Sequence, residues 1–356
     1  MNFTTDMRDY GYKGSKIIDE KHIPARITAV HRERFEAVCG YGQVSARIKT
    51  GAYKDGLTEY PTAGDFVSIE YNPIGDSLIA DTLPRSSFFS RKDPTPGRGE
   101  QAVAANFDYV FIMQSLNHDL NLRRMERYLT LSWQSGAIPV ILLTKADISD
   151  NISGAVRDIS KAAAGADIIP VSSKTGYGLD RLGDYICPRK TAVFLGSSGV
   201  GKSSLVNALA GEEIMNVNGI REDDSKGRHT TTHRQLVLLK SGAMIIDTPG
   251  MRELGMWDAA EGISTAFEDV EKLASMCRFS DCRHENEPGC AVRAAIERGE
   301  LSEERLLSYK KLASESESND KQDMLRKKRE KFKDIALQNK NRRKTERRFG
   351  GKNEYR

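Results

Sequence analysis

Residues 196–203 read Gly-Ser-Ser-Gly-Val-Gly-Lys-Ser; they follow the apolar stretch 192–195 and lead into a helical pattern over residues 202–210. Two glycines at this spacing, followed by Lys and Ser, predict a phosphate-binding loop between a strand and a helix. Backbone N–H groups close around the phosphates, and the amino end of the helix adds a positive dipole end. Lys202 then supplies charge to the β- and γ-phosphates, and Ser203 a hydroxyl ligand to Mg²⁺. The alternative is a glycine-rich turn without a ligand.

A second phosphate-side motif follows farther along the chain. Residues 247–250 read Asp-Thr-Pro-Gly and end the apolar stretch 243–246. The aspartate can hold Mg²⁺ through water, and the glycine N–H can sense the γ-phosphate. Between the two motifs, residues 227–232 read Gly-Arg-His-Thr-Thr-Thr within a polar stretch. We expect a switch loop there, with either Thr230 or Thr231 as a Mg²⁺ ligand.

Two further motifs distinguish guanine from adenine. Residues 144–147 read Thr-Lys-Ala-Asp directly after a predicted strand, and residues 172–174 read Ser-Ser-Lys after the next strand. The Asp147 carboxylate can accept hydrogen bonds from guanine N1–H and N2–H₂, which adenine does not offer as a pair. Lys145 would lie over the base, and a backbone N–H of the Ser-Ser-Lys segment would face guanine O6. A lone Lys-x-Asp triplet is common in surface loops. The prediction of a guanine site therefore depends on the combination of this triplet with the other motifs.

The order of these motifs is unusual, because the base-reading motifs precede the phosphate loop. In an open parallel sheet the ligand sits at the carboxyl ends of the strands whatever their chain order. The sequence therefore predicts a doubly wound α/β domain that is a circularly permuted P-loop GTPase. In this order the segment 247–255 runs directly into the C-terminal region, so we expect nucleotide state to act on that region. The candidate nucleotide-binding residues are Thr144, Lys145, Asp147, Ser172, Ser173, Lys174, Gly196, Ser197, Ser198, Gly199, Val200, Gly201, Lys202, Ser203, Ser204, Thr230, Thr231, Asp247 and Gly250.

The hydrolytic machinery departs from the common pattern. Met251 follows the Asp-Thr-Pro-Gly motif, where many GTPases carry a glutamine that orients water. A methionine side chain cannot position water, so unaided hydrolysis should be slow or should use another group. His229 is the candidate for that group and Lys202 for the charge on the phosphates. A solvent-exposed loop histidine is the alternative interpretation of His229.

Three cysteines and one histidine are clustered near the C-terminal end: Cys277, Cys282, His284 and Cys290. Three thiolates and one imidazole form a closed tetrahedral ligand set for structural Zn²⁺, without an open position for catalysis. A small helical unit with little core of its own would need such a metal to fold. Packed free cysteines are the alternative.

Short alternating segments punctuated by glycines between residues 23 and 91 predict a small antiparallel barrel. An OB-like barrel is the first choice, although the alternation does not exclude an SH3-like one. Beyond residue 257 the pattern becomes helical. The predicted architecture is thus an N-terminal all-β barrel, a central permuted α/β GTPase domain and a C-terminal α-helical zinc domain. The predicted boundaries are 1–20 for a loose arm, 21–92 for the barrel, 93–258 for the GTPase domain, 259–314 for the zinc domain and 315–356 for a basic tail.

Charge is distributed unevenly along the chain. The net charge is +4, but residues 321–356 hold 15 Lys/Arg against 5 Asp/Glu. A basic arm on a mildly acidic body is typical of a polyanion binder, whereas a solvated tail without function is the alternative. The sequence has no apolar run of about 18 residues or more, and its first residues do not resemble a secretion signal. We therefore expect a cytoplasmic protein without a membrane partner, and nothing requires a dimer, so we expect a monomer.

The combination of motifs resembles the bacterial ribosome small-subunit-dependent GTPase family, also called RsgA or YjeQ. The resemblance spans residues from about 22 to 310 and depends on the permuted motif order, residues 227–232, residues 247–250 and the Cys/Cys/His/Cys spacing. It implies GTP or GDP, Mg²⁺ and one Zn²⁺ as ligands, and His229 as catalytic histidine. It also implies binding to 16S rRNA surfaces late in maturation of the small ribosomal subunit, with hydrolysis stimulated by that subunit.

Two rival functions stay open at this point. One is a nucleotide-binding RNA chaperone in which GTP only stabilises the fold, and the other is a permuted GTPase that serves the large subunit. One departure concerns Thr144, because asparagine is usual there and braces the phosphate loop. The change puts the rigidity of that loop in question more than the choice of base.

Overall fold

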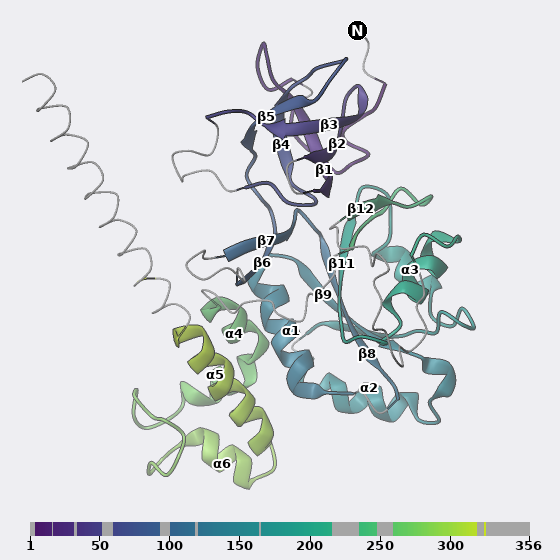
Figure 1. The fold of residues 1–356 in the computed structure, drawn as a ribbon. Coiled ribbons are helices and arrows are strands. Elements are labelled where there is room, and N and C mark those ends of the chain that lie inside the picture. The colour runs from purple at the N-terminus through teal and green to yellow at the C-terminus, as the bar shows by residue number, and fades with distance from the viewer. Residues whose placement is uncertain are drawn as a thin grey trace, which may run out of the picture.

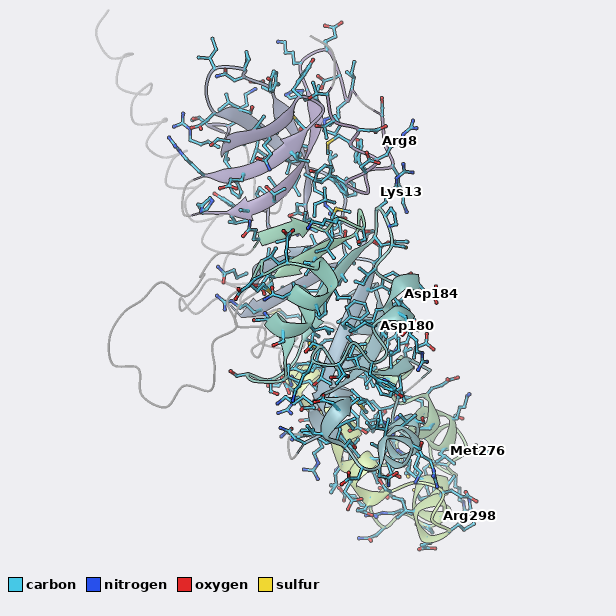
Figure 2. All side chains as sticks on the ribbon, turned by 90° about the vertical axis from the view of Figure 1, so that its right-hand side faces the viewer. Arg8, Lys13, Asp180, Asp184, Met276 and Arg298 are labelled. Atoms are coloured by element: carbon cyan, nitrogen blue, oxygen red, sulfur yellow. The ribbon has the colours of Figure 1, made fainter. Side chains whose placement is uncertain are left out.

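The computed structural model shows three units in a row, with a β-barrel at one end, an α/β domain in the middle and a group of helices at the other end (Figure 1). In Figure 2, Arg8 and Lys13 lie beside the barrel, Asp180 and Asp184 on the α/β domain, and Met276 and Arg298 on the helices. None of the described helices is long and apolar enough to cross a membrane. The structure describes residues 4–15, 17–31, 34–51, 60–92, 100–117, 120–163, 165–215, 235–247, 259–318 and 324.

The barrel has five strands, which enclose a core of their own. The order is β1-β2-β3-β5-β4, and pairing of β1 with β4 closes it. The β3–β5 pair is parallel, and the other pairs are antiparallel. A closed five-stranded barrel in this order is OB-like, which confirms the first choice from the sequence. The strands are β1 (Ile23–Val30), β2 (Phe35–Cys39), β3 (Gly42–Ile48), β4 (Phe66–Glu70) and β5 (Ser77–Thr82).

The central sheet has the order β10-β9-β8-β11-β13-β12. The first five of these strands run parallel, and β12 is antiparallel to β13. The apolar runs that the sequence offers here suit a parallel sheet covered on both faces. The strands are β8 (Tyr109–Ser115), β9 (Ile138–Thr144), β10 (Asp167–Pro170), β11 (Thr191–Leu195), β12 (Gln235–Leu238) and β13 (Met244–Asp247).

Helices cover both faces of this sheet, as the doubly wound prediction requires. Alternate residues of β8 belong to different cores: Ile112 packs with α1 and α2, whereas Phe111 packs with α3. Asn121 caps α1 by accepting a hydrogen bond from the Arg124 N–H at 3.0 Å. The elements are α1 (Leu122–Gln134), α2 (Ile152–Ser160), α3 (Lys202–Ala210) and the short 3-10 helices η1 (Ala146–Ile148) and η2 (Asp180–Asp184).

A hairpin of β6 (Phe88–Lys92) and β7 (Glu100–Ala105) forms a separate two-stranded sheet. Phe89 stacks on Phe107 with ring centroids 4.7 Å apart, which ties the hairpin to the start of the α/β domain. The predicted barrel region ends at residue 92, inside this hairpin. Because β6 pairs with β7 rather than with a barrel strand, the pairing favours a boundary before β6.

The C-terminal helices continue the core of the α/β domain. They are α4 (Ala260–Ala266), α5 (Glu268–Ala274), α6 (Ala291–Glu297) and the helical residues 303–318. Phe267, Val292 and Leu306 belong to the same apolar cluster as Leu129 of α1. The approach is tight, since a Cβ on Gly262 of α4 would lie 2.4 Å from the carbonyl oxygen of Thr130 in α1.

Arg305 fastens this helical unit to α1. It is 8% exposed and donates to Glu126 Oε1 of α1 at 2.7 Å. It also forms a two-bond pair with the Asp269 carboxylate, at 2.9 and 2.8 Å, and stacks 4.3 Å over the ring of Phe267. Burial alone would lower the pKa of Arg305, but the two carboxylates raise it above its ordinary value. The joint therefore centres on a buried, charged guanidinium that is paired with two carboxylates.

Arg26 of β1 occupies the corresponding position in the joint between the barrel and the α/β domain. It is 1% exposed, and it donates to the carbonyl oxygens of Gly64, Tyr10 and Asn106 and to the hydroxyl of Thr191. These acceptors are neutral, and burial lowers the pKa of Arg26 to about 10. The backbones meet closely here, because a Cβ on Gly64 would lie 2.2 Å from the carbonyl oxygen of Ala105.

The N-terminal arm packs against this joint over residues 4–15. The N–H groups of residues 4 and 5 donate to the Gly40 carbonyl oxygen at 2.8 and 3.0 Å. Met7 is buried, and the ring of Tyr12 lies 5.2 Å from that of Phe66 in the barrel. Asp9 pairs with Arg189 of the α/β domain at 3.3 Å. The prediction of a loose arm was wrong for these residues, because they fill the corner between two units.

Candidate nucleotide and zinc sites

The predicted nucleotide-binding motifs lie at one edge of the central sheet. Strands β10, β9, β8, β11 and β13 are parallel neighbours in that order. Thr144 ends β9, the phosphate loop follows β11 and Asp247 ends β13. Because parallel strands end at the same edge, motifs that are separated in the chain meet there.

The phosphate loop has the backbone that its glycines predict. Gly199 and Gly201 adopt φ values of 76° and 100°, in the left-handed region that disfavours other residues. A Cβ on Gly196 would lie 3.1 Å from Cβ of Met113 in β8, so only a glycine fits easily. Helix α3 begins at Lys202, and no side chain caps its amino end. The first N–H groups of α3 are therefore available to an anion.

Lys202 and Asp247 form the centre of the phosphate side. Lys202 Nζ donates to Asp247 Oδ1 at 2.6 Å, and both side chains are partly buried. The contact joins the first residue of α3 to the last residue of β13. A nucleotide phosphate is the natural partner of the ammonium group, and Mg²⁺ that of the carboxylate. Ser203 follows Lys202 in the first turn of α3.

The base side is organised by a hydrogen bond between the two guanine motifs. The Ser172 hydroxyl donates to Asp147 Oδ1 at 2.6 Å and accepts from the Thr175 N–H at 3.2 Å. This hydrogen bond, together with the charges of Lys174 and Lys145, lowers the pKa of Asp147. The carboxylate is therefore ionised and able to accept the paired donors of guanine. Of the other candidates, Ser173, Ser197, Ser203 and Ser204 are half-buried, whereas Ser198 and Lys174 are exposed.

Thr144 braces the phosphate loop in place of the usual asparagine. Its hydroxyl donates to the carbonyl oxygen of Val200 at 2.7 Å, and the side chain is buried. The bond joins the base-reading and phosphate-reading motifs directly. Sequence reasoning left the rigidity of the loop open, because the acceptor is a backbone group 56 residues away. No sequence motif marks this carbonyl oxygen as the acceptor.

Several predicted residues lie outside the described part of the chain. They are His229, Thr230 and Thr231 of the expected switch loop and Gly250 of the Asp-Thr-Pro-Gly motif. Their roles in catalysis and in Mg²⁺ binding stay predictions. Residues 93–99 and nearly all of the basic tail 321–356 are likewise outside the description.

The four predicted zinc ligands come together beyond α5. The ligand atoms of Cys277, Cys282, His284 and Cys290 all lie within 4.8 Å of one another. The Sγ atoms of Cys277 and Cys290 are 3.9 Å apart, and His284 Nδ1 lies 3.6 and 3.5 Å from them. A tetrahedral Zn²⁺ with ordinary bond lengths would separate two sulfurs by about 3.8 Å and sulfur from nitrogen by about 3.6 Å. The cluster therefore fits zinc.

The loop around the cluster is held by its own backbone. Glu287 accepts hydrogen bonds from the N–H groups of Arg283 and Glu285 at 2.9 and 2.8 Å. Hydrogen bonds from backbone N–H groups lower the pKa of Glu287 to about 2. His284 has φ of 56°, and Cys290 forms the amino-terminal cap of α6. The ligands are thus preorganised by local turns.

Comparison with known proteins decides the family. Residues 82–257 match the profile of the RsgA GTPase family. A relative from Listeria monocytogenes, named small ribosomal subunit biogenesis GTPase RsgA 1, is 46% identical over 291 residues, which cover 82% of each chain. The chain belongs to the RsgA GTPase family. It is therefore a GTP-hydrolysing enzyme, and the family resemblance inferred from the motifs is confirmed.

Solved structures show the same fold as this RsgA-family chain. YjeQ from Thermotoga maritima superposes with a TM-score of 0.61 at 24% identity, covering 81% of this chain and 96% of that one. YloQ, described as a circularly permuted GTPase, superposes with a TM-score of 0.59 at 24% identity, covering 86% and 98%. At this identity the likeness concerns the fold alone. It confirms the permuted order of strands that the motif order predicted.

Proposed function

We propose that this chain binds the small ribosomal subunit and hydrolyses GTP to GDP and phosphate during the late maturation of that subunit. One observation supports the proposal most directly. At the carboxyl ends of the central strands, an RsgA-family chain has both the Lys202–Asp247 pair and the Ser172–Asp147 pair. The relative named above is a small ribosomal subunit biogenesis GTPase, which supports the choice of subunit. A monomer in the cytoplasm that contacts 16S rRNA is part of the same proposal.

Each side chain at this edge has a role in the proposal. Asp147 accepts the guanine donors, Lys145 covers the base, and the Ser172–Lys174 segment presents a backbone N–H to guanine O6. On the phosphate side, Lys202 binds the β- and γ-phosphates, and Ser203 is a ligand of Mg²⁺. Asp247 reaches the ion through water. When bound, Mg²⁺ neutralises charge on the phosphates.

The hydrolytic step is proposed to depend on residues of the switch segment. Since Met251 cannot orient water, we assign that role to His229, with Thr230 or Thr231 as a further Mg²⁺ ligand. The basic segment 321–356 is proposed as an rRNA-binding arm, because 15 of its residues are Lys or Arg. Unchanged affinity for the small subunit after deletion of this segment, across a salt series, would remove that assignment.

The decisive experiment measures phosphate release by the purified chain alone, with small subunits and with large subunits, using ATP as a control. Stimulation by small subunits that requires GTP is expected. Stimulation by large subunits alone would favour the large-subunit alternative, and no stimulation would favour an RNA chaperone.

A variant at Asp147 tests the base site separately. In Asp147→Asn, an amide N–H replaces a carboxylate oxygen, so the pairing with guanine N2–H₂ is lost while xanthine O2 gains a donor. We expect GTP affinity to fall at least about tenfold, which corresponds to about 1.4 kcal/mol, and xanthosine triphosphate to bind better. Exposed Asp180 of the same domain supplies the control, since Asp180→Asn should leave both affinities unchanged. Equal GTP affinity in the Asp147 variant would contradict the base assignment.

A further inference from the structure

Strand β12 belongs to two units at once. Gln235, its first residue, pairs with Asp247 of β13 on one side and with Ala29 of β1 on the other. Asp247 also accepts the hydrogen bond from Lys202 of the phosphate loop. A continuous series of contacts therefore leads from the phosphate loop to a strand of the barrel.

Strand β1 is shaped to make this contact. Its first half, from Ile23 to Arg26, pairs with β4 of the barrel. Its pairing with β2 shifts register between Ile27 and Ala29, and Ala29 then faces Gln235. A register shift of this kind bends a strand and increases its local twist. The bend lets the end of β1 leave β4 and reach β12.

The contact is also narrow. Among the described residues, Ala29 and Gln235 are the single register pair between β1 and β12, whereas β12 and β13 share four pairs. The apolar core of the barrel is a separate cluster. A strand contact of one register pair opens at a lower free-energy cost than the four-pair ladder of β12 and β13, so small changes at either end can shift it.

The end of β13 is where bound nucleotide acts. A nucleotide phosphate competes with Asp247 for Lys202, and Mg²⁺ attracts the Asp247 carboxylate. Both ligands therefore change the partners of the residue that lies opposite Gln235. A ligand with different affinities for two positions of β12 must shift the balance between them.

We propose that the Ala29–Gln235 pair is a regulatory contact that couples nucleotide state at the phosphate loop to the position of the barrel, and so to the grip of the barrel on its RNA partner. The inference rests on the proposed function. Coupling is reciprocal, so an RNA surface that holds the barrel changes nucleotide affinity by the same factor.

Hydrogen exchange of the full chain tests the coupling directly. Exchange is measured with GDP and with a non-hydrolysable GTP analogue, after fluorescence has confirmed that both bind. We expect amides of residues 27–30 and 235–238 to differ at least about threefold in exchange between the two states, while residues 42–48 of β3 and 291–297 of α6 do not. Equal exchange at 27–30 in both states would overturn the inference. Failure of both nucleotides to bind would instead overturn the proposed function, and the inference with it.

A covalent lock provides the second test. Opposed residues of antiparallel strands have Cα atoms about 4.5–5.5 Å apart, within the range of a disulfide. The pair Ala29→Cys and Gln235→Cys therefore locks the contact in zinc-loaded protein. The matched control is Glu36→Cys with Ser45→Cys. It joins two exposed residues that lie opposite each other on strands β2 and β3 of the barrel. Binding to small subunits is then measured in both nucleotide states.

The lock should abolish the difference in small-subunit affinity between the analogue-bound and GDP-bound forms, and reduction of the disulfide should restore it. The control pair should keep the full difference in both redox states. An undiminished difference in the locked chain would overturn the inference, because the contact would then be only structural.

Discussion

The barrel and the C-terminal helices attach to the same α/β domain by different physical means. The barrel has a separate apolar core, and in the described part of the chain its joint includes one β1–β12 strand pair, the hydrogen bonds of Arg26 to neutral acceptors and the close approach of Gly64 to Ala105. The C-terminal helices share one apolar cluster with α1, and Arg305 links them to Glu126 and Asp269. The joint of the C-terminal helices is therefore an extension of the α/β core, whereas the joint of the barrel connects two units that have separate apolar cores.

This difference indicates which unit can respond to nucleotide. Movement at the helical joint would break apolar packing and uncover buried charges, which is costly. Movement at the barrel joint would rearrange hydrogen bonds to neutral groups, including those of Arg26, but it would leave the separate apolar core of the barrel intact. The permuted order places segment 247–255 directly before α4, and an effect of nucleotide state on the helices stays a prediction. The joints themselves favour the barrel as the unit that shifts.

Zinc removal should have the largest effect on local stability. This effect should be confined to the C-terminal helices and should not reach the barrel. Structural zinc contributes on the order of 10 kcal/mol to folding of small zinc domains. We expect Cys290→Ser or chelation to abolish hydrogen-exchange protection of α6, while β3 of the barrel keeps its protection. Cys187→Ser, outside the cluster, is the control. Loss of protection in both units would show that they are not independent.

Replacement of Arg305 should have the next largest effect, which is a loss in the free energy of unfolding. Arg305→Met leaves the Glu126 carboxylate buried without a cation, which costs about 3–5 kcal/mol in the free energy of unfolding. Urea unfolding measures the loss. The double variant with Glu126→Leu should recover most of it, because an apolar pair replaces the charged one. Arg298→Met, at an exposed pair with Glu300, should change nothing measurable. Equal effects of both single variants would contradict a special role of the buried cluster.

The two close backbone approaches give a matched pair of substitutions. Gly64→Ala places a Cβ against the Ala105 carbonyl oxygen and also requires alanine at φ of 90°, so we expect a loss of about 3 kcal/mol. Gly262→Ala meets the Thr130 carbonyl oxygen at ordinary helical φ and should cost about 2 kcal/mol. Thermal unfolding compares them.

Gly42→Ala isolates the backbone term of that comparison, since Gly42 has φ of 102° and a Cβ added there would meet nothing within 4 Å. It should cost about 1 kcal/mol. If Gly42→Ala destabilised the chain as much as Gly64→Ala, the close approach at the barrel joint would contribute nothing.

The smallest effect on the free energy of unfolding is expected at the N-terminal arm. Arg189 and Asp9 are 60% and 62% exposed, and exposed pairs contribute about 0.5 kcal/mol or less. Arg189→Ala should therefore shift unfolding by no more than that amount, and added salt should remove the shift. A larger loss would mean that charge, rather than the burial of Met7, holds the arm in its corner.

Much of the central domain could be predicted from the sequence. The helix predicted over residues 202–210 is α3 to the residue, and the apolar stretches 192–195 and 243–246 lie within one residue of the bounds of β11 and β13. Glycine spacing and apolar runs are local signals, and the ligand chemistry of each motif follows from its own side chains. The zinc cluster was predictable for the same reason, since all four ligands lie close together in the chain.

Other features carried no local signal. The arm, for example, was expected to be loose. Arg26 reads in the sequence as one more charged strand residue, yet it is among the largest fully buried side chains. Its acceptors come from four distant places in the chain, so only the assembled joint could reveal its role.

The sequence by itself determined the chemistry of this protein: a phosphate loop, a guanine site, a zinc set and their permuted order. Each motif depends on residue types at short spacing within one segment, so the sequence displays its chemistry directly. The tertiary structure alone decided how the units are joined, because contacts between distant segments are set by packing. That includes the hydroxyl of Thr144 on the phosphate loop, the shared core under the zinc helices and the single strand pair that joins the barrel to β12.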